Sequence, residues 1–165
     1  MTSILKVSEI QDPTNSNTAL TIDSSGRITK PQQIAFLAYN STSGNVTYSA
    51  SDNLSADMTS TEFNAGGHYQ TSGSDVGKFI APITGYYFLG CNLFNNTVSV
   101  TRISLYRESD AVSFAGQGQR NQYNDVNISS VVYLTANEKV YINSLYASII
   151  YHGANHSYFY GYLIG

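Results

Sequence analysis

Apolar and polar residues alternate along most of this chain with the two-residue period of β-strands, and no stretch shows the period of a helix. The clearest case is the stretch 77–94, where Pro82 and Gly85 separate a short strand from a longer one. Past Gly85, one face of the predicted strand carries Tyr87, Leu89, Cys91 and Leu93, and the other carries Tyr86, Phe88, Gly90, Asn92 and Phe94. A strand that is apolar on one face and aromatic on the other is covered on both sides. We therefore expect the first set to fill a core and the second to face another sheet layer or another subunit.

The same alternation predicts a series of short strands separated by loops rich in Gly, Asn and Ser. The predicted strands cover residues 34–39, 46–48, 62–69, 77–94, 98–106, 125–134, 139–150 and 156–164. Short strands at this regular spacing are typical of an all-β sandwich. The sequence therefore predicts a jelly-roll β-sandwich over residues 34–165.

Residues 1–33 follow a different pattern and are predicted to be a separate N-terminal arm. Residues 5–10 alternate weakly, residues 12–17 form a turn-rich break, and residues 19–22 and 27–29 flank a turn that contains Gly26, which predicts a small hairpin. So small a hairpin cannot bury enough apolar surface to stand alone. We expect the arm to dock onto another surface. Its predicted docking residues are Leu5, Val7, Ile10, Leu20, Ile22 and Ile28.

The last predicted strand is apolar on both faces. Phe159, Gly161 and Leu163 share one face, while Tyr158, Tyr160, Tyr162 and Ile164 share the other. An exposed tyrosine row would be unusual on a monomer, whereas tyrosine suits a protein interface. The sequence therefore predicts oligomerisation through this strand and residues 34–39. The predicted interface residues are Phe36, Tyr39, Tyr86, Phe88, Tyr158, Tyr160 and Tyr162.

Composition excludes several classes of partner. Charged residues make up only 12% of the chain, the formal net charge is −3, and the eight Lys and Arg residues are scattered. Without a basic patch, nucleic acid is not expected as a ligand. No apolar run is long enough to span a bilayer, and the first residues lack the pattern of a signal peptide, so no membrane partner is expected. The single cysteine, Cys91, is predicted to pack in the core.

Candidate catalytic and metal-binding residues do not form a recognisable pattern. His152 and His156 have a spacing that brings ligands together on a helix, but here they flank a Gly-Asn loop and are interpreted as surface or interface residues. The candidate carboxylates are too scattered for a catalytic pair; they belong to Glu62, Glu108, Asp110 and Asp125. We therefore expect no enzymatic activity, no metal and no cofactor.

A polar loop over residues 116–125 is the candidate ligand site. It combines Gln, Arg, Asn and Tyr, which suit hydrogen bonding and stacking on sugars. The alternative is an ordinary solvated loop at the end of the sandwich. The residues singled out are Gln117, Arg120 and Tyr123, and a host surface glycan is the partner that they would bind.

Three motifs in this sequence are similar to those of a known family. They are Phe79, Gly85 and Tyr87 with Pro82 between the first two, the turn 134–142 with the sequence Leu-Thr-Ala-Asn-Glu-Lys-Val-Tyr-Ile, and the terminal run Phe159-x-Gly161-x-Leu163-Ile164. In this order they resemble the globular head of complement C1q and its relatives in the C1q/tumour-necrosis-factor superfamily. Asn137 and Glu138 replace the Gly-Asp of the family's turn, but Asn tolerates the left-handed conformation. The resemblance implies a C1q-like trimerisation domain. The calcium held by some C1q-like heads is not carried over, because no acidic cluster is present.

The first thirty residues carry a second resemblance. Leu-Lys-Val-Ser-Glu-Ile-Gln-Asp at 5–12 and Leu-Thr-Ile-Asp-Ser-Ser-Gly-Arg-Ile-Thr at 20–29 resemble the leader of virion structural proteins from tailed phages, especially cyanophages. This implies a homotrimer on the virion surface, assembled in the host cytoplasm and attached through its arm to the major capsid protein or another virion protein. The absence of a collagen repeat argues against an animal secreted protein.

Two functions remain open under this resemblance. A fully extended arm of residues 1–33 spans at most about 110 Å, which is enough to grip neighbouring subunits but makes no fibre shaft. No heptad, collagen or β-helix repeat supplies a shaft either. We therefore expect a capsid decoration or cement protein, with the receptor- or glycan-binding head of a tail fibre as the alternative.

Overall fold

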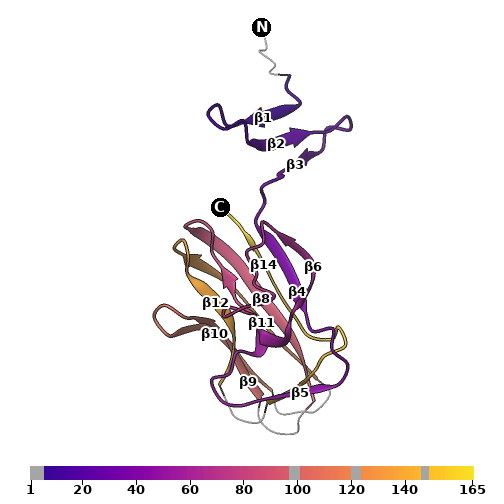
Figure 1. Ribbon diagram of the computed structural model, residues 1–165, viewed down its shortest axis with the longest axis vertical. Coiled ribbons are helices and arrows are strands. Elements are labelled where there is room, and N and C mark those ends of the chain that lie inside the picture. Colours follow the sequence, from indigo (N-terminus) through magenta and orange to yellow (C-terminus); the bar gives the residue numbers. More distant parts are fainter. Residues whose placement is uncertain (1–5, 97–100, 120–123, 146–148) are drawn as a thin grey trace. The chain divides into compact units, whose positions relative to one another are not determined.

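Antiparallel strands form almost all of the regular structure, as the alternating sequence predicts. The computed structural model describes residues 6–96, 101–119, 124–145 and 149–165, and the chain divides into two units, Met1–Gln33 and Ile34–Gly165 (Figure 1). No helix in these described ranges is long and apolar enough to cross a membrane.

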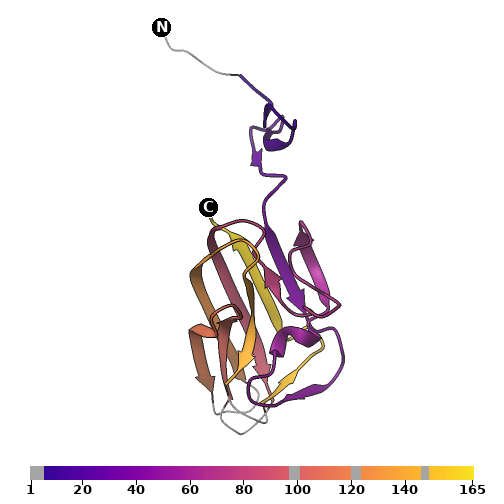
Figure 2. The same cartoon turned by 60° about the vertical axis from the view of Figure 1, so that its left-hand side comes forward.

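Two sheets make up the larger unit. The four-stranded sheet has the order β10 (Val112–Gln119), β9 (Thr101–Arg107), β12 (Lys139–Ser144) and β7 (Phe79–Ile80). The seven-stranded sheet has the order β5 (Asn45–Tyr48), β13 (Ile149–His152), β8 (Gly85–Asn95), β14 (Tyr158–Leu163), β4 (Ala35–Tyr39) and β6 (Ser60–Ala65), with β11 (Asn124–Leu134) also paired to β8. The two sheets pack face to face (Figure 2), so the predicted jelly-roll sandwich is confirmed.

Strand β8 lies at the centre of the seven-stranded sheet because β11 and β14 pair along most of its length. Its inward side chains, Tyr87, Leu89, Cys91 and Leu93, are all at most 1% exposed, as the alternation predicts. Residues of both sheets complete the core, including Phe79, Ile103, Leu105, Val126, Leu134, Val140, Ile142 and Phe159. Burial of these apolar side chains supplies the main driving force for folding.

Phe36 lies in the middle of this core. Its ring stacks on Tyr69 and on Phe79, with 5.0 Å between ring centroids in each pair, and meets Phe159 edge-on. Gly161 lies beside the Phe36 ring. A side chain does not fit there, because its Cβ would come within 2.4 Å of Leu89 and 3.0 Å of the ring. The prediction that Phe36 belongs to a subunit interface is therefore wrong: its side chain is only 1% exposed.

Several element bounds differ from those predicted. Residues 112–119 form β10, so the part of the predicted polar loop at 116–119 is a strand paired with β9. Residues 139–150 form two strands, β12 and β13, which belong to different sheets. The strand expected at 62–69 begins at Ser60 and ends at Ala65. The sequence pattern shows alternation, but it does not show to which sheet a strand belongs.

A short 3-10 helix, η1 (Leu54–Asp57), lies against β12 and is visible as the purple coil in Figure 2. The hydroxyl of Tyr151 donates to the carbonyl of Leu54 at 2.9 Å, and the hydroxyl of Tyr69 lies 3.1 Å from the carbonyl of Ser55. These tyrosines therefore satisfy backbone groups that a buried helix end would otherwise leave unpaired. Burial raises the pKa of Tyr151 to about 12, which keeps its hydroxyl protonated as a donor.

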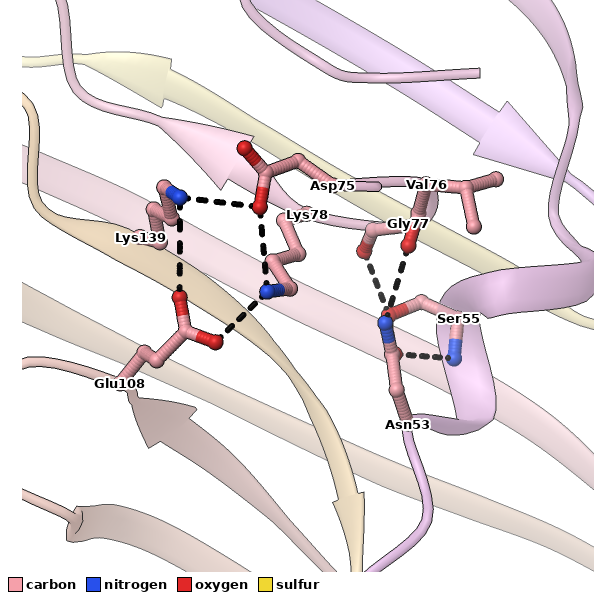
Figure 3. A network of polar contacts seen from close by, with 8 residues as sticks. All are labelled: Asn53, Ser55, Asp75, Val76, Gly77, Lys78, Glu108 and Lys139. Carbon is pink, nitrogen blue, oxygen red and sulfur yellow. Dashed lines mark hydrogen bonds and ion pairs between the residues drawn. The ribbon is translucent and has the colours of Figure 1, made fainter. Parts of the chain in front are cut away.

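The loop before β7 is held by two adjoining polar networks (Figure 3). In the first, the Ser55 hydroxyl lies 2.7 Å from the carbonyl of Gly77 and accepts the backbone N–H of Ile142 at 3.1 Å. Gly77 has a φ of 80°, and a Cβ there would come within 2.4 Å of the Ser55 backbone. Only glycine fits this position, because it combines left-handed backbone with close approach.

The second network is a ring of four charged side chains drawn from the loop, β9's end and β12. Lys78 lies 3.1 Å from Asp75 and 2.6 Å from Glu108, while Lys139 lies 2.9 Å from Asp75 and 3.9 Å from Glu108. The hydrogen bonds from Lys139 and then Lys78 lower the pKa of the Asp75 carboxyl. The ring ties segments that are far apart in the sequence to one edge of the four-stranded sheet.

The smaller unit is a three-stranded antiparallel sheet with the order β1 (Glu9–Gln11), β2 (Thr18–Ile22) and β3 (Ile28–Thr29). Strands β2 and β3 form the predicted hairpin, with Gly26 at a φ of 78° in its turn. Strand β1 adds a third strand where the sequence showed only weak alternation.

Candidate functional site: the aromatic face

The outward side of the seven-stranded sheet carries a continuous set of apolar and aromatic side chains. Register fixes this arrangement, because residues paired directly across an antiparallel ladder share one face of the sheet. One row joins Val131, Phe88 and Tyr162, and the next joins Gly90, Tyr160, Leu37 and Phe63. We define the aromatic face by these and their neighbours: Leu37, Tyr39, Phe63, Tyr86, Phe88, Val131, Tyr133, Tyr158, Tyr160 and Tyr162.

Much of the aromatic face lies open in the single chain. Tyr86 and Val131 are each 55% exposed, and Tyr162 is 46% exposed. The outward positions of the three central strands, β8, β14 and β4, hold no Lys, Arg, Asp or Glu. Large uncharged patches of this kind are rare on monomers and mark sites of interaction.

Contacts among the rings hold this surface in one arrangement. Tyr86 meets Tyr133 with 5.2 Å between centroids, and Phe88 lies 5.4 Å from Tyr162 and 6.2 Å from Tyr160. Each pair joins two neighbouring strands. Because the side chains are already ordered by one another, little rotamer entropy is left to lose when the face binds a partner.

Gly90 makes room for the central tyrosine. A Cβ at this position would lie 2.6 Å from the hydroxyl and 2.7 Å from Cζ of Tyr160, so the Tyr160 ring lies directly over the glycine. Burial in this position raises the pKa of the Tyr160 hydroxyl. Gly90 interrupts the aromatic residues along β8, and the Tyr160 ring of β14 fills the space above it. The aromatic face is therefore continuous across the two strands.

Most of the residues predicted for the interface are brought together here. Tyr39, Tyr86, Phe88, Tyr158, Tyr160 and Tyr162 all lie on the aromatic face, and Phe36 is the exception. The sequence reading missed Leu37, Phe63, Val131 and Tyr133. A strand that is apolar on both sides does not show which side faces out, and only the register with β8 and β14 settles the choice.

The aromatic face ends in a small hollow near Tyr158. A hollow of about 290 Å³ is lined by Leu37, Tyr39, Glu62, Asn155 and Tyr158. Its two tyrosines and single carboxylate combine an apolar wall with a polar group, which is the usual make-up of a small binding site.

The two histidines considered as metal ligands lie at the same end of the sheet. The rings of His152 and His156 are 5.3 Å apart, and Phe94 lies 5.5 Å from His156. Among the residues that the structure describes, no three His, Cys, Asp or Glu side chains gather as a metal site would require. The cluster is therefore an aromatic contact between β8 and β13–β14.

Cys91 lies on the opposite, inward side of β8. It is 1% exposed and unpaired, and burial raises the pKa of its thiol. Because the thiolate is the reactive form, this cysteine acts as a small core residue.

Residues 120–123 of the predicted ligand loop lie outside the described residues. Arg120 and Tyr123 lie among them, while Gln117 belongs to β10 and its backbone pairs with Ile103 of β9. The sugar-binding role of these three residues therefore stays a prediction.

A second aromatic surface occurs on the other sheet. Tyr106 and Tyr141 are paired across β9 and β12 with 5.1 Å between their centroids, and the Lys78 ammonium lies 5.9 Å from the Tyr141 ring. Both tyrosines are half-buried. This pair lies on the side of the sandwich that faces away from the aromatic face.

Comparison with known proteins gives a consistent result. The sequence profile of the C1q domain matches residues 35–164. The globular domain of the zebrafish complement 1qA protein has a TM-score of 0.61 at 17% identity, covering 80% of this chain and 98% of that one. The Eiger TNF of S. frugiperda has a TM-score of 0.64 at 12% identity, covering 81% and 94%. At these identities the two structures show a shared fold. No curated protein matches the sequence.

Proposed function

The chain belongs to the C1q domain family, and from this premise we propose that it is a homotrimeric structural protein of a virion. C1q/TNF domains are typically non-enzymatic binding or structural domains, and they commonly form homotrimers. In this proposal the three subunits meet through the aromatic face, and the unit 1–33 attaches the trimer to a particle.

The aromatic face is the observation that carries the trimer. An uncharged surface with half-exposed Tyr86, Val131, Tyr133 and Tyr162 would be costly to leave in water, at about 25 cal/mol for each Å² of apolar area. Its rings are already ordered by mutual contact, as in the centres of subunit interfaces, where tyrosine is enriched.

A measurement of mass tests this part of the proposal. We expect light scattering on the purified chain at micromolar concentration to give three times the monomer mass of 18.0 kDa. Tyr162→Lys places a charge in the aromatic face and should yield monomers with an unchanged β-sheet circular dichroism spectrum. Tyr106→Lys, on the other sheet, is the matched control and should leave the trimer intact. A monomeric wild-type chain would refute the trimer.

The virion role rests on the leader. Residues 5–12 and 20–29 resemble the leaders of tailed-phage structural proteins, and the unit they belong to is a small sheet rather than a shaft. This arrangement suits a decoration or cement protein, which binds the major capsid protein or another virion protein at the particle surface.

Localisation on particles tests the virion role. We expect antibodies against the chain to label phage heads uniformly, and we expect a chain lacking residues 2–30 to lose its binding to purified undecorated heads. Labelling confined to the tail would instead support the alternative, a receptor- or glycan-binding head. One observation favours that alternative: the Tyr106–Tyr141 pair lies on the sheet that the proposed trimer leaves exposed, and paired aromatic rings can stack on sugars.

A further inference from the structure

The three-stranded sheet of the N-terminal unit has one face that carries four apolar side chains. Ile10 is paired with Leu20 across β1 and β2, and Ile22 is paired with Ile28 across β2 and β3. Leu20 and Ile22 are two residues apart on one strand, so all four side chains point to the same side. Ile10 is 45% exposed and Ile28 is 63% exposed. We call these four residues the isoleucine face.

The opposite face is polar and satisfies its own hydrogen bonds. Glu9, Thr21 and Thr29 form one row across the three strands. The side chain of Glu9 accepts hydrogen bonds from Gln11 and Thr18, and the hydroxyls of Thr21 and Thr29 bond to each other. This face is therefore suited to water, and the isoleucine face is the one that needs a cover.

A sheet this small cannot provide the cover itself. An isolated hairpin is at best marginally stable in water, and the third strand here has only 3 residues, so we expect a second apolar layer to pack on the sheet about 10 Å away. Within the unit 6–33, the described residues outside the strands are turns that offer no such layer. The cover therefore comes from outside the described part of this unit.

We propose that the isoleucine faces of three copies of this chain pack against one another and form a triangular prism on the threefold axis. This inference rests on the proposed trimer of residues 34–165 and adds a second, separate interface to it. The polar faces then lie outside, where they are available to a partner on the particle.

Two features of the chain favour its own copies as the occupant. Residues 30–34, which join the two units, span at most about 20 Å between Thr29 and Ala35, so trimerisation of the larger unit would hold three N-terminal units at an effective concentration of roughly millimolar. The side chains of residues 1–33 also carry three positive and three negative charges, Lys6, Arg27, Lys30, Glu9, Asp12 and Asp23. Three copies therefore meet without net repulsion.

Threefold packing also fits the symmetry better than pairing. If two copies covered each other face to face, the third copy of a trimer would keep its isoleucine face in water. A closed threefold arrangement gives every copy the same environment.

Cysteine cross-linking of the full chain tests the prism. With mild oxidant, Ile28→Cys should give a disulfide-linked dimer on a denaturing gel, because the three sulfur atoms would lie near the axis. Thr29→Cys, on the polar face, is the matched control and should stay monomeric on the same gel. The native Cys91 is buried and contributes no background.

Proteolysis gives an independent measurement. Ile22→Asp should leave the mass of the trimer unchanged while trypsin cleaves after Arg27 about tenfold faster or more, because the local sheet opens. Thr21→Asp, on the polar face, is the matched control and should remain as resistant as the wild type.

The outcomes separate this inference from the proposed function. A trimer by light scattering in which Ile28→Cys does not cross-link, or in which trypsin cleaves after Arg27 in the wild type as fast as in Ile22→Asp, overturns the prism and leaves the trimer standing. Cross-linking through Thr29→Cys instead would show that the opposite face is inside, which also overturns it. A monomeric wild-type chain would refute both proposals.

Discussion

Gly90 connects one residue of β8 to the organisation of the whole aromatic face. The Tyr160 ring lies over it, and the neighbouring rings of Phe88 and Tyr158 are in turn in contact with Tyr160. A residue without a side chain is thus what allows an aromatic residue on the adjacent strand to lie flat on the sheet.

Replacement of Gly90 tests this relation. Gly90→Ala should lower the free energy of unfolding by about 1–3 kcal/mol, because its Cβ would overlap Tyr160. Gly116→Ala is the matched control: it is also a strand glycine, but its Cβ would meet only the carbonyl of Ile103 at an ordinary 3.4 Å. Denaturant titration at one protein concentration measures both.

The double variant identifies the cause. In a Tyr160→Ala background the Gly90→Ala substitution should cost little, since the overlapping ring is gone. An equal cost in both backgrounds would show that the strain lies in the backbone of β8 and not in its contact with Tyr160.

At the residue scale, the sequence could predict burial wherever the alternation was unambiguous. The inward set of β8 from Tyr87 to Leu93 is buried as predicted. Phe36 was misplaced because residues 34–39 are apolar on both sides, so either side could have faced out. What decides the orientation is the three-ring contact with Tyr69, Phe79 and Phe159, and those partners are far away in the sequence.

At the scale of elements, the loop before β7 is placed by polar contacts that no local pattern announces. The ring of Asp75, Lys78, Glu108 and Lys139 joins this loop to β12 and the end of β9 (Figure 3). Its members are partly exposed, so the contribution of each pair to stability is modest and depends on salt.

The pH dependence of stability isolates the contribution of Asp75. Its pKa in the folded chain is lowered by the hydrogen bonds from Lys139 and Lys78, so the carboxylate stabilises the fold above its unfolded pKa, and this stabilisation is lost as the pH falls through the folded pKa. Asp75→Asn should therefore cost up to about 1 kcal/mol at pH 7 and progressively less below about pH 4.

Denaturant titrations of wild type and Asp75→Asn between pH 7 and pH 2 measure this difference. In 1 M salt, where the Debye length is about 3 Å, the difference at pH 7 should shrink. A difference that persisted unchanged at pH 2 would mean that Asp75 acts through packing or through hydrogen bonds that do not depend on its charge.

The same scale shows where element prediction from sequence stops. Strands β8, β11 and β14 follow from alternation and turn residues. Strand β10 lies outside every predicted strand. Its second half, Gly116 to Gln119, has the composition of a loop, and the pairing with β9 overrides that local preference. The helix η1 is similarly held by the hydroxyls of Tyr151 and Tyr69, which come from distant segments.

At the scale of the whole molecule, only one face of the seven-stranded sheet is covered by the described residues of its own unit. The inward face packs on the four-stranded sheet, and the aromatic face meets nothing within the described part of its own unit. The alternation in residues 77–94 predicted a strand covered on both sides, and the fold accounts for one of those covers. The proposed trimer accounts for the other.

If the trimer supplies that cover, the apparent stability must depend on protein concentration, because the unfolding of one trimer then releases three separate chains. With an unfolding enthalpy of about 0.7 kcal/mol per residue, a tenfold increase in concentration should raise the Tm by about 3–4 °C. Tyr162→Lys, as a folded monomer, should have a lower Tm that does not change with concentration, while Tyr106→Lys should retain the dependence. Calorimetry or circular dichroism over a hundredfold concentration range measures all three chains. A wild-type Tm that stayed constant over this range would mean that the aromatic face is not buried between copies, and that some other partner covers it.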